Sequence, residues 1–345
     1  MNGYERVRAA VEGRRPDRVP VMLHNFLMAA DEAGYTQARY RASAAAMADS
    51  HARAVERYGY DGVMLEMDTA VVAGALGVPV AFPEEAPART VAPLLERLEE
   101  VGRLKPVHVE DYPYIRTCLE AVRLLVARFR GQIYVRGNCD QLALSLATMV
   151  RGAAELYMDL CYPEKEGWVH ELLEYCNGAA LQYIRLMAQT GCDMVSNGDS
   201  PAGPDLISPE MYERFALPYE KRVVDEAHRL GLPYALHICG DTTRILEPMI
   251  RTGTDCLELD YKTDTAAAHA ALKDRVTLIG NVDPSGVLRW GDAGKVEEAA
   301  RALCRAFADT PRFILNAGCA IPQGTPGENL RALVRVAAEF RSSPS

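Results

Sequence analysis

The chain has 345 residues, of which 49% are hydrophobic, and its formal net charge is −9. This composition supports a large folded core, and the acidic balance without a basic run longer than Arg14-Arg15 argues against nucleic acid as a partner. The N-terminus lacks the apolar core of a signal peptide, and no stretch approaches the ~18 uninterrupted apolar residues of a membrane span. Nine scattered cysteines do not form a secreted disulfide framework, so we expect a cytoplasmic protein with mostly reduced thiols.

Short β-rich runs alternate with longer helical segments along the chain. We predict eight strands, over Val19–His24, Gly62–Met67, Ile133–Arg136, Met194–Asn197, Tyr234–Ile238, Cys256–Leu259, Thr277–Ile279 and Phe313–Leu315. Predicted helices that separate them include Ala44–Tyr58, Pro209–Leu230, Lys295–Asp309 and Thr325–Phe340. Thr325, Pro326 and Glu328 form the pattern of a capping box at the start of the last helix, and Ser208 precedes Pro209 in a similar way.

Eight strands that alternate with helices predict a closed (β/α)8 barrel of the TIM type. A doubly wound open sheet is the competing architecture, but the chain has no Gly-x-Gly-x-x-Gly turn and no phosphate loop. We expect residues 1–345 to form a single barrel domain. Within it, residues 1–18 are a helical lead-in, and residues 78–93, which are rich in Pro, Ala and Glu, are a surface excursion.

Polar side chains stand at the end of each predicted strand. In a barrel these ends converge on the C-terminal face, where active sites lie. The candidate substrate-binding residues are therefore His24, Asn25, Glu66, Asp68, Asn138, Asn197, Asp199, Asp260 and Asn281. The alternative role is helix capping for Asp68, Asp199 and Asp260. For Asn281, close to Asp283-Pro284, the alternative is a turn.

The most specific pattern is His237-Ile238-Cys239 at the end of the fifth strand, together with Cys319 after the eighth. Residues i and i+2 of a strand point to the same face, so His237 and Cys239 can share a ligand. One His and two Cys leave one position of a zinc ion open, which is the catalytic pattern. A structural zinc is the alternative, although the chain has no Cys-x-x-Cys. Glu66 is a candidate fourth ligand.

A sulfur-rich zinc site favours chemistry at sulfur. Zinc with one neutral His and two thiolates carries no net charge, and it can hold an external thiol as thiolate. A free thiol of pKa ~8.5 is only slightly ionised at neutral pH, so coordination removes that limit. Because thiolate ligands make zinc a weaker Lewis acid for hydrolysis, we expect alkyl transfer to a thiol, with His237, Cys239 and Cys319 as the catalytic residues.

Several further motifs carry a resemblance to a known superfamily. They are Glu5-Arg6-Val7, Arg15-Pro16-Asp17-Arg18-Val19-Pro20, Ser208-Pro209-Glu210-Met211-Tyr212, Leu217-Pro218-Tyr219, His237-Ile238-Cys239-Gly240-Asp241-Thr242, Gly280-Asn281-Val282-Asp283-Pro284, Gly318-Cys319-Ala320-Ile321-Pro322 and Thr325-Pro326-Gly327-Glu328-Asn329. With these motifs the chain resembles the uroporphyrinogen decarboxylase-like barrels. It is most similar to their zinc-dependent branch, the methylcobamide:coenzyme M methyltransferases.

The resemblance implies a (β/α)8 barrel with zinc on His237, Cys239 and Cys319. It also implies methyl transfer between a thiol and a corrinoid (methylcobamide) that a separate corrinoid protein supplies. The methyl donor or thiol would be a small molecule, and a homo-oligomer is compatible with the fold. The chain departs from the decarboxylases where they carry arginines after strand one, because it reads His24-Asn25-Phe26-Leu27-Met28 there. Asp68 stands where the decarboxylases place a substrate-binding Asp.

Two alternatives remain open from the sequence. One is a metal-independent decarboxylase of a carboxylated substrate, with Asp68 and the polar strand ends delivering protons. The other is a non-catalytic barrel that binds a corrinoid protein, with zinc stabilising the fold.

Overall fold

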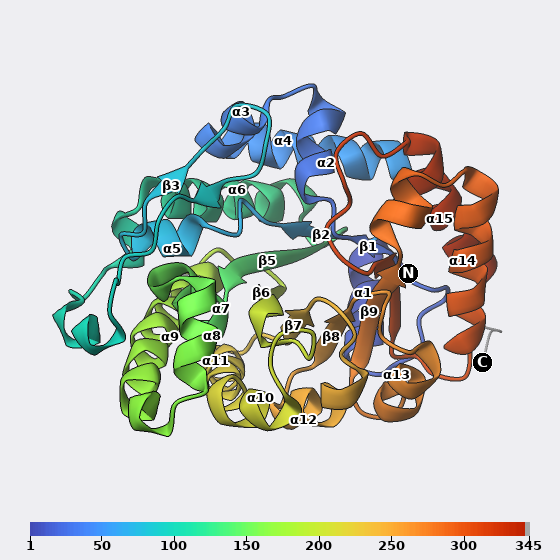
Figure 1. The fold of residues 1–345 in the computed structure, drawn as a ribbon. Coiled ribbons are helices and arrows are strands. Elements are labelled where there is room, and N and C mark those ends of the chain that lie inside the picture. The colour runs from blue at the N-terminus through green and yellow to red at the C-terminus, as the bar shows by residue number, and fades with distance from the viewer. Residues whose placement is uncertain (342–345) are drawn as a thin grey trace.

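Eight parallel strands form the centre of the molecule. The computed structural model describes residues 1–341 and pairs the strands in the order β1-β2-β5-β6-β7-β8-β9-β10 (Figure 1). A parallel bridge between Val21 and Leu315 joins the first strand region to the last, so the sheet is a nearly closed barrel. The strands are β1 Met22–Leu23, β2 Gly62–Leu65, β5 Tyr134–Gln141, β6 Met194–Gly198, β7 Tyr234–Ile238, β8 Cys256–Leu259, β9 Thr277–Val282 and β10 Phe313–Ala317.

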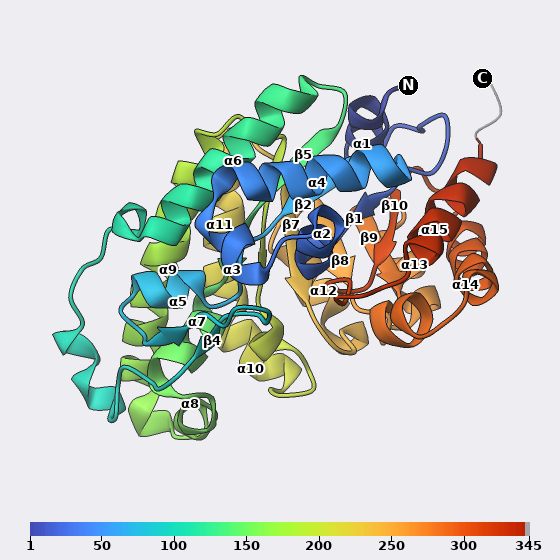
Figure 2. The same ribbon diagram turned by 90° about the horizontal axis from the view of Figure 1, so that it is seen from above.

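Helices surround the barrel, and one short hairpin lies outside it (Figure 2). The hairpin pairs β3 Val80–Ala81 with β4 Arg89–Thr90. The helices are α1 Gly3–Val11, α2 Phe26–Ala33, α3 Gln37–Ala42, α4 Ala44–Tyr58, α5 Val71–Ala75, α6 Pro113–Phe129, α7 Ala143–Arg151, α8 Ala153–Leu160, α9 Glu166–Ala188, α10 Pro209–Phe215, α11 Leu217–Arg229, α12 Leu246–Arg251, α13 Thr265–Leu272, α14 Ala293–Ala306 and α15 Gly327–Glu339.

The predicted barrel and its eight strands are confirmed, with differences at the strand ends. Strand β1 is shorter than predicted, whereas β9 runs three residues further. Strand β5 runs on to Gln141 through an irregularity, because its register with β6 shifts between Asn138 and Gln141. Asp140 lies inside this shift with φ of 60°, a left-handed conformation that bulges accommodate in a strand. Alternation of side chains alone does not reveal such a bulge.

Two helix predictions need correction. The segment Pro209–Leu230 is divided into α10 and α11, since Pro218 has no N–H to continue the hydrogen-bond ladder through Ala216. The last helix has Pro326 as its N-cap, and Thr325 is not part of a capping box. The Thr325 hydroxyl instead donates to the carbonyl of Pro322 at 2.7 Å. Ser208 caps α10 as predicted, because its side chain accepts from the Met211 N–H.

The barrel interior changes from apolar to polar along its axis. At its N-terminal end, α1 packs Val7, Ala10 and Val11 onto an apolar layer of inward-facing side chains, which are Met22, Tyr134, Met194, Ala235, Cys256, Ile279 and Ile314. Two residues further along the same strands, and therefore on the same face, stand polar side chains. These are His24, Arg136, Ser196, His237, Glu258, Asn281 and Asn316, all of them buried. Helix α1 thus closes the N-terminal end of the barrel interior. Towards the C-terminal ends of the strands, the interior is lined by polar side chains that can take part in chemistry.

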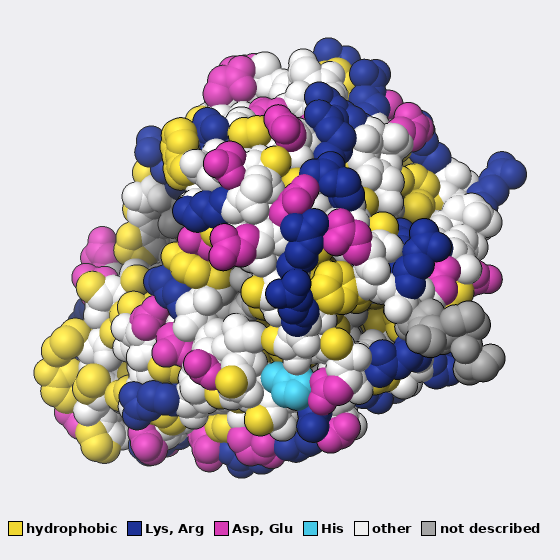
Figure 3. Space-filling model, turned by 90° about the vertical axis from the view of Figure 1, so that its right-hand side faces the viewer, with side chains coloured by type: hydrophobic (Ala, Val, Ile, Leu, Met, Phe, Trp, Pro, Cys, Tyr) yellow, Lys and Arg dark blue, Asp and Glu magenta, His cyan; other side chains and the backbone are white. Residues whose placement is uncertain are grey.

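The outer surface by α14 and α15 mixes charges of both signs. Figure 3 shows a column of Lys and Arg side chains on this side, with Asp and Glu beside it. Two ion pairs connect the two helices, Arg301 with Glu339 and Arg335 with Glu297, and Arg301 also pairs with Glu297 within α14. Such surface pairs each contribute at most about 1 kcal/mol. Over residues 1–341, no helix is both long enough and apolar enough to cross a membrane.

Candidate metal centre

His237, Cys239 and Cys319 meet at the C-terminal end of the barrel. His237 lies on β7, Cys239 follows that strand directly, and Cys319 follows β10. The Nε2 atom of His237 is 3.1 Å from the Sγ atom of Cys239, which is 3.6 Å from the Sγ atom of Cys319. The three candidate ligand atoms all lie within 4.8 Å of one another. The structure therefore brings Cys319 together with His237 and Cys239, although Cys239 and Cys319 are 80 positions apart in the chain.

The imidazole of His237 is oriented by the neighbouring strand. Its Nδ1 atom lies 2.9 Å from the carbonyl oxygen of Glu258 on β8. A carbonyl oxygen can only accept, so Nδ1 donates its proton and Nε2 is the nitrogen that faces the two sulfurs. A hydrogen bond of this kind is what commonly fixes the tautomer of a metal-binding histidine.

The electrostatics of the cluster favour one thiolate. The hydrogen bond from the Cys319 thiol, aided by His237, holds the pKa of Cys239 well below its ordinary value, although burial opposes this. That same bond, together with burial, raises the pKa of Cys319 well above its ordinary value. Burial opposes a charge on His237, but the adjacent Cys239 thiolate raises its pKa to about 10. Cys239 is thus already in its metal-binding form, whereas His237 and Cys319 would each release a proton on binding a metal.

The donor set fits zinc. Two sulfurs on one tetrahedral zinc, each about 2.3 Å from it, stand about 3.8 Å apart. The two cysteine sulfurs are 3.6 Å apart, close to that value. The 3.1 Å between Nε2 and the Cys239 sulfur would open by about half an ångström. Both cysteines are partly accessible, so the cluster can be reached from the barrel mouth.

Beneath the cluster lies a buried chain of alternating charges. Arg136 Nη2 is 2.5 Å from Glu258 Oε2, and Glu258 Oε1 is 2.8 Å from His24 Nδ1. His24 Nε2 is 3.0 Å from Glu66 Oε2. The Arg136 pair is held by charge at short distance without a well-aligned hydrogen bond. The ring of His24 stands nearly perpendicular to that of His237, with centroids 6.1 Å apart.

These neighbours set the charges along the chain. Burial opposes ionisation of Glu258, but Arg136 and His24 outweigh it and hold the pKa of Glu258 well below its usual range. Burial also opposes a charge on His24, yet Glu258 and Glu66 raise its pKa to about 9. At neutral pH His24 is therefore an imidazolium that donates to both carboxylates, which is the protonation state that two acceptors require.

Apart from Asp68, the predicted substrate-binding residues fall into two groups. His24, Glu66, Asn138, Asp260 and Asn281 lie around the polar upper interior. Asn138 accepts from the Ser196 hydroxyl at 2.9 Å, and Asn281 donates to the carbonyl of Asp260 at 3.1 Å.

The second group comprises Asn25, Asn197 and Asp199. Asn197 faces away from the interior, where it accepts from the Tyr234 hydroxyl and donates to the carbonyl of Cys139. Asp199 accepts from the backbone and side chain of Ser145 in α7, which is a capping contact. Asn25 is fully buried at the start of α2. The structure thus gives Asn197 and Asp199 contacts within the fold, and a substrate-binding role for these three side chains stays a prediction.

Asp68 is engaged by the excursion that follows β2. Its Oδ2 atom is 3.2 Å from Arg41 Nη1, and its Oδ1 atom accepts from the Ala88 N–H at 2.7 Å. Arg41 also donates to the carbonyls of Ala86 and Pro83. Both charged side chains are 1% exposed. The pair thus anchors residues 79–91, which we call the strap, beside the barrel mouth.

The sequence placed Arg136, Glu258 and Asn316 at polar strand ends, but we did not include them, or Ser196, among the candidate site residues. Asn316 donates to Glu258 at 3.3 Å and accepts from the His24 N–H at 2.8 Å, so it belongs to the same network. The signal that identifies them is their position two residues after the apolar inward-facing layer on each strand. In a short strand such as Cys256–Leu259, the sequence alone does not show which residues face the barrel interior. The neighbouring strands are needed to decide this.

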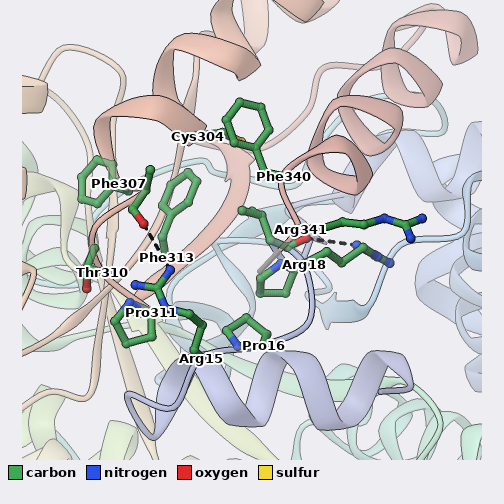
Figure 4. Close-up of a pocket in the computed structure, with 13 residues that line it drawn as sticks. Arg15, Pro16, Arg18, Cys304, Phe307, Thr310, Pro311, Phe313, Phe340 and Arg341 are labelled. Atoms are coloured by element: carbon green, nitrogen blue, oxygen red, sulfur yellow. Dashed lines mark hydrogen bonds between the residues drawn. The ribbon is translucent and has the colours of Figure 1, made fainter. Parts of the chain in front are cut away.

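A separate small cavity of about 100 Å³ lies at the other end of the barrel (Figure 4). It is lined by the segments before β1 and β10, the first residue of β10, the end of α14 and the residues after α15, whereas the candidate ligands lie at the C-terminal ends of β7 and β10. Its arginines are engaged in structural contacts. Arg15 donates to the carbonyls of Ala308 and Asp309, and Arg18 pairs with Asp61. This cavity is therefore not part of the metal centre.

Comparison with known proteins gives two kinds of relative. The uroporphyrinogen decarboxylase (URO-D) family model matches residues 2–340. A methylcobamide:CoM methyltransferase (MtbA) of Methanosarcina mazei is 32% identical over 250 residues, which are 72% of this chain and 70% of that protein. A uroporphyrinogen decarboxylase of a Synechococcus species is 30% identical over 289 residues, or 81% of this chain and 78% of that protein.

A solved structure described as a methyltransferase from Methanosarcina mazei shares the fold. It matches with a TM-score of 0.89 at 21% identity, and the match covers 98% of this chain and 99% of that one. Fold and cluster together define a (β/α)8-barrel protein with a candidate metal centre in its mouth. Within that class, the chain belongs to the uroporphyrinogen decarboxylase (URO-D) family. Since decarboxylases and methyltransferases are similarly related to it, the choice between these activities depends on the site.

Proposed function

We propose that this enzyme is a zinc-containing methyltransferase that moves a methyl group between a thiol and a protein-bound methylcobamide. The observation that carries the proposal is the cluster of His237, Cys239 and Cys319, whose ligand atoms lie within 4.8 Å of one another at the barrel mouth. The relatives named methylcobamide:CoM methyltransferases support the corrinoid as donor class. The sulfur-rich donor set supports a thiol as acceptor.

When bound, zinc would hold the incoming thiol as a thiolate that remains nucleophilic at neutral pH. The protein's own residues orient and balance the centre. His237 offers Nε2 because its Nδ1 proton is given to the Glu258 carbonyl. Two thiolates and a neutral imidazole offset the charge of a divalent cation. Beneath the cluster, His24 and Arg136 offset the charges of Glu66 and Glu258. These four buried side chains therefore add no net charge to the site.

The site disfavours decarboxylation. A decarboxylase of this fold would need Asp68 to reach its substrate, but the carboxylate of Asp68 is 1% exposed and is paired with Arg41. Burial raises the pKa of Asp68 to about 6, although Ala88 and Arg41 oppose the rise. A substrate could contact this side chain only after the strap had been displaced.

We further propose a partner protein and a cellular location for the reaction. The methylcobamide reaches the cluster on a separate corrinoid protein that docks at the strands' C-terminal ends, where both candidate ligand cysteines are partly accessible. A cytoplasmic location suits the site, because the candidate ligand cysteines, like the other seven, are free thiols that a reducing compartment preserves.

The test is demethylation of methylcobalamin, followed by its absorbance, with a panel of thiols including coenzyme M. We expect zinc- and thiol-dependent activity in the wild type, and its loss in Cys319→Ser with the barrel still folded. Cys161→Ser is the matched control, because Cys161 is an exposed cysteine outside the cluster. Full activity of Cys319→Ser would favour a metal-independent reaction. Unfolding on zinc removal, without any transferase activity in the wild type, would favour structural zinc.

A further inference from the structure

Asp260 touches both of the turns that carry the cysteines. It follows β8 directly and is buried. Its Oδ2 atom accepts from the N–H of Gly240, the residue after Cys239, at 2.9 Å. Its Oδ1 atom accepts from the Lys262 N–H at 3.1 Å, which holds the carboxylate in place within its own turn.

The other side of Asp260 supports the turn before Cys319. A Cβ atom on Gly318 would lie 2.6 Å from the Tyr261 nitrogen and 3.2 Å from the Cα and carbonyl carbon of Asp260. The backbone of Gly318 therefore rests directly on the Asp260–Tyr261 peptide. The Gly318 N–H also donates to the carbonyl of Val282 at 2.8 Å, which keeps this turn against the barrel.

The turn after Cys239 depends on its contact with Asp260. Gly240 has φ of +87°, a left-handed conformation that favours glycine and allows Cys239 to project over the mouth. A hydrogen bond from a backbone N–H to a carboxylate is stronger than a neutral one, so it can hold a glycine turn that would otherwise be loose. One residue thus restrains a turn from β7 with its side chain and a turn from β10 with its backbone.

We propose that Asp260 is a positioning residue that sets the separation of the Cys239 and Cys319 sulfurs, and is not a substrate ligand. This inference rests on the proposed function in so far as the separation matters for zinc. The geometric part concerns the two sulfurs, 3.6 Å apart, and can be measured without any metal.

The metal-independent measurement is the equilibrium between the two thiols and their disulfide in a glutathione buffer. Oxidised glutathione is reduced to two glutathione thiols while the Cys239 thiolate and the Cys319 thiol form one sulfur–sulfur bond; one of the two protons comes from Cys319 and the other from the buffer. The full chain is used in a Cys161→Ser background, which removes an exposed competing thiol. The second measurement is zinc affinity by competition with a chromophoric chelator.

We expect Asp260→Ala to lower the disulfide formation constant about tenfold, which corresponds to one charge-assisted hydrogen bond. It should weaken zinc binding by about 10–100-fold, as the loss of a residue that orients metal ligands does elsewhere. Asp260→Asn keeps an acceptor for the Gly240 N–H and should restore most of both values. Gly318→Ala disturbs the contact of the Cys319 turn with the Asp260 backbone. It should lower both the disulfide formation constant and the zinc affinity.

Asp264→Ala is the matched control. Asp264 is an exposed residue of the same loop, and its side chain caps α13; its backbone N–H donates to the Thr243 hydroxyl, a contact that an alanine keeps. Wild-type values for both measurements in Asp260→Ala would overturn the positioning role while leaving the proposed zinc chemistry intact. A fall in the disulfide constant in a protein that does not bind zinc would sustain the positioning role and overturn the proposed function.

Discussion

Replacing Glu258 with Gln tests the buried charge network beneath the candidate metal centre. Glu258 is fully buried between Arg136 at 2.5 Å and His24 at 2.8 Å. At an effective dielectric constant of about 20, two charges about 4 Å apart attract by about 4 kcal/mol. Gln keeps the shape and one acceptor but leaves two buried cations short of an anion. Removing one partner of a buried pair costs about 3–5 kcal/mol, so we expect a loss of about 3 kcal/mol.

This loss is measurable by thermal unfolding. The unfolding entropy expected for 345 residues is about 0.7 kcal/mol per kelvin, so Tm should fall by about 4 °C. Glu247→Gln is the control, because Glu247 forms a bidentate but exposed pair with Arg275. That pair is worth at most about 1 kcal/mol, and its loss should shift Tm by less than about 2 °C. A Glu258→Gln variant as stable as this control would refute the network as described.

Two further predictions concern stability near the mouth. Burial lowers the pKa of His51, which lies 2.9 Å from the Tyr40 hydroxyl, to about 4. The unfolded chain therefore binds one more proton between about pH 6.5 and 4, and stability should fall by about 3 kcal/mol as the pH drops through that window. Urea unfolding of His51→Gln should show a correspondingly weaker pH dependence, and an unchanged slope would contradict this. Arg41→Met should leave Asp68 buried and unpaired, at a cost of about 3–5 kcal/mol, and should speed hydrogen exchange in residues 79–91. Exchange there at the wild-type rate would show that the pair does not anchor the strap.

Much of the architecture could be predicted from the sequence, because strand and helix periodicity differ and turn residues separate the segments. The clustering of three candidate ligands could also be predicted, since His237 and Cys239 share one face of a strand and Cys319 follows another. The barrel geometry then brings these strand ends together.

The partners of individual polar side chains could not be predicted. Asp68 and Asp199 both follow strands, and only the packing of distant segments shows that one anchors the strap and the other caps α7. Glu258 is a single acidic residue in an apolar strand, and its role depends on Arg136 and His24 from strands far away in the chain. Long-range pairing of this kind leaves no local pattern.

Zinc K-edge X-ray absorption on freshly purified protein tests the central claim most directly. We predict one zinc per chain with one nitrogen and two sulfur ligands from the protein, at about 2.0–2.1 and 2.3 Å. Addition of the active thiol should increase the sulfur count from two to three, and Cys239→Ser should lower it by one. A protein without zinc, or a zinc with only oxygen and nitrogen neighbours, would contradict the assignment of His237, Cys239 and Cys319 as its ligands.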